Sequence, residues 1–212
     1  MNTVEDFLTQ DDTDMSVAML AMVRNKFCFV IQPPKRWGKT EDGRDILFFG
    51  GIGGKLESTE GLMAALHREA KEEIGCDIKV ISKANVCNLP IITKEHIDFK
   101  QTSATAQTLL PLCIFQNKRS EPGRKSTTNV FIYQTIIEDV EKMQPLDNPA
   151  IILLPPETLY QMENGMDMAQ ALREGAEIFS NIDLPVNAVL KPTPTPIAII
   201  KLHNLYKGNL IN

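Results

Sequence analysis

Three glutamates near the end of the first third of the chain have a spacing that suits cation binding. Glu69, Glu72 and Glu73 occupy positions i, i+3 and i+4, and on an α-helix this spacing places their carboxylates within an arc of roughly 100°. Like charges so close together destabilise a helix unless something neutralises them. Mg²⁺ takes oxygen ligands and often holds substrate phosphates at the same time. The spacing therefore indicates a divalent-cation site for phosphate chemistry.

The surrounding residues predict the helix that would present these carboxylates. Gly61 can serve as its N-cap, and Gly75 as a left-handed C-cap. Arg68 lies four residues before Glu72, so its guanidinium could hold that carboxylate by a charge-assisted hydrogen bond. A separate apolar stripe predicts the face that packs on a core; it consists of Met63, Leu66, Ala70 and Ile74.

A glutamate-rich helix face is more often a solvated surface than a site. Here, however, the glutamates follow a glycine-rich turn made of Gly50, Gly51, Gly53 and Gly54, and Glu60 lies between the turn and the helix. A structural domain with an accidental glutamate face is therefore the weakest interpretation of the pattern.

The run Gly54–Cys76 resembles the Nudix box, G-x5-E-x7-R-E-U-x-E-E-x-G-U, in which U is a bulky aliphatic residue. The matching residues are Gly54, Glu60, Arg68, Glu69, Glu72, Glu73 and Gly75. The chain departs from the pattern at both U positions, which hold Ala70 and Cys76. It also has Thr59 where relatives often have glycine.

The resemblance implies a Nudix-like α/β/α sandwich of the α/β (α+β) class, with a mixed sheet and extra C-terminal helices. It also implies Mg²⁺-dependent hydrolysis of a nucleoside diphosphate linked to another group, with Mn²⁺ able to substitute for Mg²⁺. By carry-over from the motif, the metal ligands are Gly53 (through its carbonyl), Glu69, Glu72 and Glu73, while Glu60 and Arg68 hold the loop and the carboxylates in place. Arg68, Glu72 and Glu73 are accordingly expected to be catalytic.

The general base is less sharply indicated, because relatives take it from the box or from a later loop or strand end. Glu138, at the end of an expected strand, is the candidate outside the box, followed by Glu95 and Glu141. Each of these alone is more often a surface carboxylate than a base, and a pKa raised towards neutrality would favour one of them.

Basic and aromatic residues near the box are candidate substrate contacts. Lys55 lies inside the box and could contact a phosphate. Lys35, Arg36 and Trp37 could together hold a phosphate and stack a base. Surface exposure is the alternative for each of them. His67 lies on the helix flank away from the carboxylates and is expected to be structural.

The sequence leaves the substrate open. Pro90 lies fifteen residues beyond Gly75, one short of the spacing in ADP-ribose-cleaving relatives, and lacks their Ser-Pro-Gly setting. The run G-G-K-L-E is similar to that of members that cleave nucleoside triphosphates. A nucleotide sugar and a dinucleoside polyphosphate are further alternatives.

Composition narrows the class of protein. The chain has 212 residues, 43% of them hydrophobic and 23% charged, as is ordinary for a globular protein. A net charge of −5 argues against binding polymeric nucleic acid. The expected partner is instead a small nucleotide substrate, and a homodimer is left open.

Cysteine usage and the termini favour a cytoplasmic protein. No C-x-x-C pair occurs, and the four cysteines, each in or beside an apolar run, are expected to be reduced; they are Cys28, Cys76, Cys87 and Cys113. The three histidines show no ligand spacing. The acidic N-terminal segment has the wrong charge for a signal peptide, and no apolar run approaches the ~18 residues of a membrane span.

The expected division of the chain is an N-terminal arm (1–14), a Nudix hydrolase domain (15–160) and a C-terminal helical extension packed on the same domain (161–212). Strands are expected at 16–32 as a hairpin turning at Arg24–Lys26, and at 46–49, 77–92 with an interruption at Asn88–Pro90, 111–115, 129–137 and 150–154. Helices are expected at 61–75, 157–163, 167–179 and 197–207. The segment 33–45 is expected to be a loop, 93–109 a long loop or short helix, and 191–196 stiff and extended.

A function of another class is compatible with the same fold. Some Nudix domains bind a nucleotide without turnover and regulate a partner, and these tend to have a degraded box and a basic winged-helix appendage. Here every acidic ligand of the box is present, and the segment after residue 157 is not conspicuously basic. The enzyme is therefore favoured over the sensor.

Overall fold

The computed structural model describes residues 12–81, 87–102, 109–118 and 127–206. In these ranges the strands are β1 (Thr13–Val23), β2 (Lys26–Ile31), β3 (Gly38–Lys39), β4 (Asp45–Gly50), β5 (Ile78–Ile81), β6 (Cys87–Ile92), β7 (Ile97–Thr102), β8 (Cys113–Lys118), β9 (Thr127–Ile137), β10 (Ala150–Leu154), β11 (Met166–Asp167), β12 (Glu177–Ser180) and β13 (Val189–Pro192). The α-helices are α2 (Leu62–Ile74), α3 (Pro156–Tyr160), α4 (Met168–Arg173) and α5 (Pro194–Tyr206), and the two 3₁₀ turns are η1 (Pro34–Arg36) and η2 (Val140–Lys142).

The strands form one mixed sheet whose main path is β11-β13-β4-β2-β1-β9-β8-β6-β7. Three neighbouring pairs are parallel, namely β1 with β9, β13 with β4, and β6 with β8. The fold is thus the expected mixed α+β arrangement.

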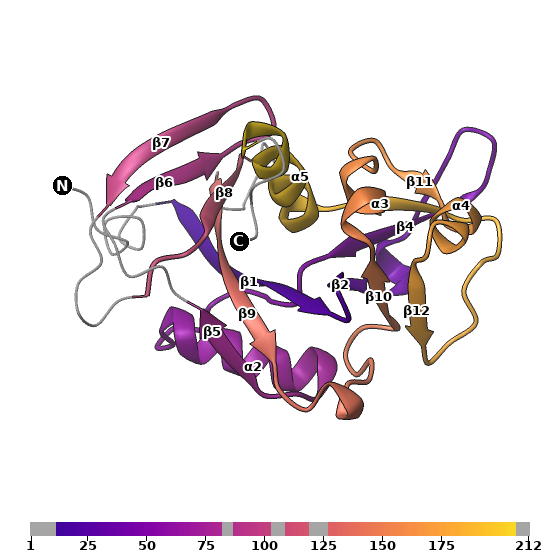
Figure 1. Cartoon of the computed structure of the whole chain (residues 1–212), viewed down its shortest axis with the longest axis horizontal. Coiled ribbons are helices and arrows are strands. Elements are labelled where there is room, and N and C mark those ends of the chain that lie inside the picture. The colour runs from indigo at the N-terminus through magenta and orange to yellow at the C-terminus, as the bar shows by residue number, and fades with distance from the viewer. Residues whose placement is uncertain (1–11, 82–86, 103–108, 119–126, 207–212) are drawn as a thin grey trace.

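Helices cover both faces of the sheet, so the protein has two cores. On one face α2 packs with residues such as Val17 and Phe131, and on the other α3, α4 and α5 pack around residues such as Phe29 and Phe49. Figure 1 shows α2 and α5 on opposite sides of β1 and β9. The sandwich expected from the sequence is confirmed.

The glycine turn lies beside β1 because β1 and β4 pair with the same edge of β2. The five residues Phe27–Ile31 of β2 pair with β10 along one edge, so β1 and β4 must share the other. The chain leaving β4 therefore runs alongside β1, and the N–H groups of Met19 and Val17 donate to the carbonyls of Ile52 and Gly54 at 2.8 and 2.9 Å. This pairing fixes where the box begins.

Several local predictions are confirmed. The hairpin of β1 and β2 turns at Arg24 and Asn25, which have φ values of 51° and 62°, as a two-residue hairpin turn requires. The strands expected at 46–49, 129–137 and 150–154 correspond to β4, β9 and β10, and the strand expected at 111–115 begins two residues later, as β8. Most of the expected N-terminal arm, residues 1–11, lies outside the described residues.

Four predictions about elements that precede β13 are wrong. Strand β7 lies within the segment 93–109, where a loop or short helix was expected, because hydrogen bonds to β6 override a sequence without periodicity. Strand β6 runs through Pro90 without the expected interruption. The helix expected at 167–179 ends at Arg173 and is followed by β12, and the expected loop 33–45 contains η1 and β3.

The C-terminal region differs most from its prediction. Besides helices, it contributes β11, β12 and β13 to the sheet. The segment 191–196 was expected to be stiff and extended, but α5 already begins at Pro194. Proline lacks an N–H and is tolerated in the first turn of a helix, where that N–H would have no partner.

Candidate functional site

The glycine turn between β4 and α2 has a backbone that only glycine can adopt without strain. Gly53 has φ of +149°, and a Cβ at this residue would lie 2.1 Å from the carbonyl oxygen of Val17. Its N–H donates to Glu73 Oε2 at 2.8 Å. The turn is therefore held against β1 on one side and against the box helix on the other.

The box helix has the predicted ends, with Gly61 as N-cap and Gly75 as a left-handed C-cap with φ of 72°. Its buried face is wider than the predicted apolar stripe, because it also contains Glu69 and Glu73, each only 9% exposed. Carboxylates are rarely buried to this extent unless a partner or a cation compensates them.

Arg68 connects the acidic residues of the box. Its Nε and Nη2 donate to the two carboxylate oxygens of Glu60, each at 2.9 Å. Its Nη1 donates to Glu69 at 2.7 Å and to Glu72 at 2.8 Å. This guanidinium lowers the pKa of Glu60, and the carboxylates raise the pKa of Arg68 in return. The arrangement agrees with the holding role implied for Glu60 and Arg68.

Glu69 fits against the glycine turn. A Cβ on Gly54 would lie 2.2 Å from Glu69 Oε1, so the box glycine leaves the space that this carboxylate occupies. Burial raises the pKa of Glu69, while its bond to Arg68 opposes that effect. Glu72, by contrast, has a side chain that is 46% exposed.

Glu73 is the most perturbed carboxyl of the site. Burial raises the pKa of Glu73 to about 8, although hydrogen bonds from Gly53 and Asn148 lower it. The second of these is a 2.6 Å bond from Asn148 Nδ2 to Glu73 Oε1. A buried carboxyl with a pKa near neutrality is typical of functional sites.

Asn148 belongs to the candidate site through its bond to Glu73, although it was not among the residues predicted from the sequence. It lies in the loop between η2 and β10, and this loop covers the C-terminal end of α2. The N–H groups of Gln144, Leu146 and Asp147 donate to the last carbonyls of the helix at 3.1–3.3 Å. The available sequence signal was the Asn148-Pro149 dipeptide, which marks a turn before an apolar strand.

The oxygen atoms of the candidate site are of the chemical type that binds a hard divalent cation. The carboxylates are oxygen donors of the kind that Mg²⁺ prefers. The Gly53 carbonyl, a ligand implied by the resemblance, accepts no hydrogen bond from any described residue, although the carbonyls on both sides of it do. Across the described ranges, no three His, Cys, Asp or Glu side chains are gathered closely enough to hold a metal together. The reason is visible in the contacts, since Arg68 binds Glu69 and Glu72 while Gly53 and Asn148 bind Glu73.

The candidate bases outside the box are exposed. Glu138 follows the end of β9, and its N–H donates to the Asp77 carbonyl at 2.8 Å, beyond the C-terminal end of α2. Glu141 lies in η2, and Glu95 in the turn between β6 and β7. The raised pKa that would single out a base occurs at Glu73.

Three of the four predicted substrate contacts have partners among the described residues. Lys55 Nζ forms an ion pair with Asp14 at 2.7 Å. Arg36 donates to the Gln32 side chain at 2.7 Å, and the indole N–H of Trp37 donates to the Gln32 carbonyl at 2.7 Å. Trp37 is half-buried against the core, while Lys35 and His67 are exposed.

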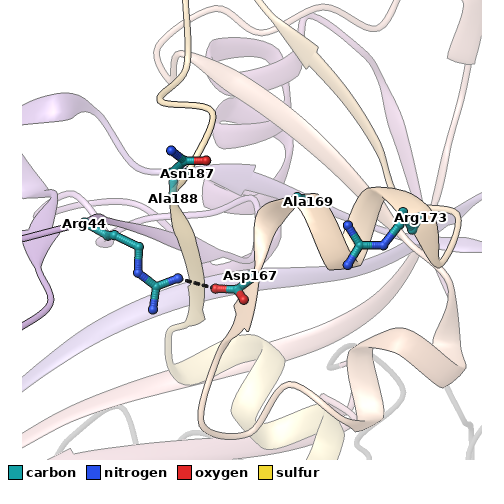
Figure 2. A pocket seen from close by; sticks show the side chains of 6 residues that line it. All are labelled: Arg44, Asp167, Ala169, Arg173, Asn187 and Ala188. Carbon is teal, nitrogen blue, oxygen red and sulfur yellow. Dashed lines mark hydrogen bonds and ion pairs between the residues drawn. The ribbon is translucent and has the colours of Figure 1, made fainter. Parts of the chain in front are cut away.

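A hollow of about 290 Å³ lies away from the box. It is lined by Arg44, Asp167, Ala169, Arg173, Asn187 and Ala188. Figure 2 shows the ion pair between Arg44 and Asp167, 2.5 Å long, on one side and Arg173 on the other. Arg44 immediately precedes β4, whereas the glycine turn follows the other end of that strand. The hollow therefore belongs to a different part of the sheet from the box glutamates.

Removing the Asn148 side chain tests whether its bond to Glu73 matters. In Asn148→Ala one of the two donors to Glu73 is lost, so the pKa of Glu73 rises further. Groups that orient a metal ligand typically change metal affinity by about 10–100-fold. We expect a loss of Mn²⁺ affinity in this range by isothermal titration calorimetry, with Asn187→Ala as the control in an exposed asparagine. Equal affinities in the two variants would remove Asn148 from the site.

Comparisons with known proteins give distant structural matches. Neither a family model nor a curated protein matches the sequence. The solution structure of the E. coli ORF135 protein aligns with a TM-score of 0.46 at 15% identity, over 92% of this chain and 91% of that one. An ADP-ribose pyrophosphatase from Streptococcus suis aligns with 0.37 at 12% identity, over 90% and 91%. A NUDIX family hydrolase from Clostridium perfringens aligns with 0.41 at 14% identity, over 69% and 83%.

The fold is identified by the box itself, in which the glycine turn follows β4 and precedes α2, and the spacing of the pattern places Glu60, Arg68 and Glu69 in one hydrogen-bonded network. On these grounds the chain has a Nudix-like fold.

Proposed function

We propose that this protein is a Nudix-type pyrophosphohydrolase that uses Mg²⁺ to cleave the pyrophosphate linkage of a nucleoside diphosphate joined to another group. The observation that carries the proposal is the buried Glu73, whose pKa is raised to about 8 and which accepts a hydrogen bond from the N–H of Gly53. The carbonyl of Gly53 accepts no hydrogen bond from a described residue. A cation at this place would receive an oxygen ligand and would favour the ionised form of Glu73.

In this proposal the ligands are Glu69, Glu72, Glu73 and the Gly53 carbonyl. A bound divalent cation would supply charge neutralisation of the pyrophosphate and a lower pKa for an attacking water. Arg68 holds Glu69 and Glu72 through one nitrogen and Glu60 through the other two. Its role is to keep the carboxylates in register with the turn.

The proton of the attacking water needs an acceptor. Glu73 is the candidate within the box, because its carboxyl is the one whose pKa burial raises furthest in the metal-free protein. Glu138 remains the alternative base outside the box. Comparing Glu138→Gln with wild type over pH 6–9 separates the two, since loss of the base removes the acidic limb of the rate profile.

The experiment that tests the function is a substrate panel assayed with Mg²⁺ and with Mn²⁺. The panel contains ADP-ribose, UDP-glucose, the nucleoside triphosphates and a dinucleoside polyphosphate. The proposal expects metal-dependent hydrolysis of at least one of them. Tight binding of a nucleotide without turnover would favour the sensor, and binding of none would contradict both functions.

The pKa of Glu73 gives a pH dependence of metal binding. At pH 6 the carboxyl, with its pKa of about 8, is mostly protonated in the metal-free protein, so a cation must displace the proton. We expect the apparent Mn²⁺ affinity to rise by up to about tenfold per pH unit below pH 8 and to level off above it. Calorimetric titrations at pH 6, 7, 8 and 9 measure this, and Glu73→Gln should lose most of the slope.

When no metal is present, the contribution of Glu73 to the free energy of unfolding should fall as the pH rises, whereas the Mn²⁺ affinity should rise. The native pKa of Glu73 is raised above its ordinary value of 4.5, so the native state binds the proton more tightly than the unfolded state. The stability from this group is therefore complete below about pH 4.5 and is lost as the pH rises towards 8. A pH-independent difference in unfolding free energy between wild type and Glu73→Gln would contradict the raised pKa.

None of the helices in the described ranges combines the length and the hydropathy needed to cross a bilayer. We propose that the protein acts on a small nucleotide and not on polymeric nucleic acid, as its net charge of −5 favours.

A further inference from the structure

Gly50 and Gly51 precede the box and do not belong to its pattern, yet both are tightly enclosed. A Cβ on Gly50 would lie 2.5 Å from Thr193 Oγ1, and a Cβ on Gly51 would lie 2.7–2.9 Å from side-chain atoms of Thr195. Both threonines come from the C-terminal segment, more than 140 residues away along the chain. The two glycines are therefore required by this segment.

Thr193 is bonded to the strand that leads into the glycine turn. Its backbone N–H and its hydroxyl both donate to the Phe49 carbonyl, each at 2.9 Å. Just before it, β13 pairs in parallel with β4, with Pro192 opposite Phe49. Two donors on one carbonyl fix the last residues of β4 before the chain turns.

The segment that carries these threonines is itself well anchored. Thr195 is 5% exposed, and α5 buries Ala198, Ile199, Ile200 and Leu202 in the core. Lys201 Nζ donates to the Thr93 carbonyl at 3.0 Å, which ties α5 to the turn between β6 and β7. Figure 1 shows the chain passing from the strands near β4 directly into α5. The threonines are thus presented by a packed helix start and not by a loose tail.

The glycine turn is consequently held from two sides. On one side Thr193 and Thr195 contact residues 49–51, and on the other the carbonyls of Ile52 and Gly54 bond to β1. Gly53 lies between these restraints, and its carbonyl, like that of Gly51, accepts no hydrogen bond from a described residue. Movement at Gly50 or Gly51 would be passed on to this carbonyl within three residues.

We propose that Thr193 and Thr195 are positioning residues, which set the glycine turn and through it the Gly53 carbonyl that faces the divalent cation. This inference rests on the proposed function for the identity of the ion. The start of α5 would then affect metal binding without contacting the ion itself.

The test measures Mn²⁺ binding by electron paramagnetic resonance in the absence of any nucleotide. The decisive variants are Gly50→Ala, Thr193→Ala and their combination. Gly50→Ala places a methyl group against Thr193 Oγ1, and in the double variant the next nearest atom is 3.7 Å away. We expect Gly50→Ala to weaken Mn²⁺ binding about tenfold, and the double variant to recover most of that loss. Thr193→Ala alone should lose less, and Thr193→Ser, which keeps the hydroxyl, should bind as wild type does.

Controls separate this effect from general damage and from failure of the proposed function. Gly38→Ala, whose Cβ would meet its nearest atom at an ordinary 3.5 Å, should leave Mn²⁺ binding unchanged.

Wild-type Mn²⁺ affinity in Gly50→Ala, or no recovery in the double variant, overturns the inference even if the enzyme hydrolyses a nucleotide. If Gly50→Ala does not fold, equal Mn²⁺ affinities of Thr193→Ala and Thr193→Ser overturn it. If the metal effects occur but no nucleotide is cleaved, the inference stands and the proposed function fails. Absence of Mn²⁺ binding by the wild type overturns the inference.

Discussion

Replacing Glu73 with glutamine is expected to reduce Mg²⁺-dependent hydrolysis by on the order of 10²–10³-fold, because it removes a charge from the centre of the site. The substitution keeps the shape of the side chain. An amide oxygen can still accept the N–H of Gly53, which now donates to Glu73 at 2.8 Å. The amide of Asn148 can turn over to offer its oxygen to the new NH₂ group. The protein should therefore fold, and the loss should appear in kcat.

The matched control is Glu163→Gln, in an exposed glutamate far along the chain, which should leave the rate within about twofold because surface substitutions have small effects. Circular dichroism and the unfolding transition of both variants establish that they fold. Hydrolysis by Glu73→Gln at the wild-type rate, with the substrate found in the panel, would remove Glu73 from the chemistry. Loss of activity in Glu138→Gln alone would assign the base to the end of β9.

Substituting Gly53 with alanine should destabilise the protein by about 3 kcal/mol or more, since strained backbone and an overpacked contact combine at this residue. Its φ of +149° suits glycine, and the added Cβ would lie 2.1 Å from the Val17 carbonyl oxygen, 2.8 Å from Ala18 Cα and 2.9 Å from the Val17 carbonyl carbon. All three are backbone atoms of β1, which cannot move aside as a flexible side chain could. Urea denaturation followed by tryptophan fluorescence measures the change.

Gly38→Ala serves as the reference, because the nearest atom to its Cβ would be at 3.5 Å and its φ lies outside the left-handed region. A change within about 0.5 kcal/mol is expected there. If Gly53→Ala were as stable as Gly38→Ala, the turn would have another conformation available, and the position assigned to the Gly53 carbonyl would be wrong.

The box could be predicted from sequence because its chemistry and its geometry are both local. Glycines at both ends of the helix and the i, i+3, i+4 spacing of the glutamates act within a few turns of one helix. The same holds for Arg68, whose partners Glu60, Glu69 and Glu72 all lie within eight residues of it. The strand–turn–helix unit follows from these patterns alone.

The rest of the site depends on contacts between distant segments, which a single sequence does not encode locally. Asn148 reaches Glu73 from 75 residues away, and its neighbours give only a turn signal. Thr193 and Thr195 lie in a proline-rich run that was expected to be extended, whereas two of its prolines fit the first turn of α5. Likewise β13 is a strand because β4 offers it an edge, as the register of Leu190 with Leu47 shows.

Trp37 is a residue for which the local pattern suggested a substrate contact, and for which the structure shows other contacts. Basic residues beside an aromatic one favoured base stacking, but the indole packs on the core and donates to Gln32. Sequence pattern alone does not distinguish an aromatic residue that binds a ligand from one that completes a core.

The most direct measurement is an anomalous difference map from a crystal soaked in Mn²⁺. We expect a peak in contact with the Gly53 carbonyl and with carboxylate oxygens from Glu69, Glu72 and Glu73, at Mn–O distances of about 2.1–2.3 Å, close to the range for hard divalent cations. A map with no peak beside these residues, or with the metal bound only elsewhere on the surface, would contradict this expectation.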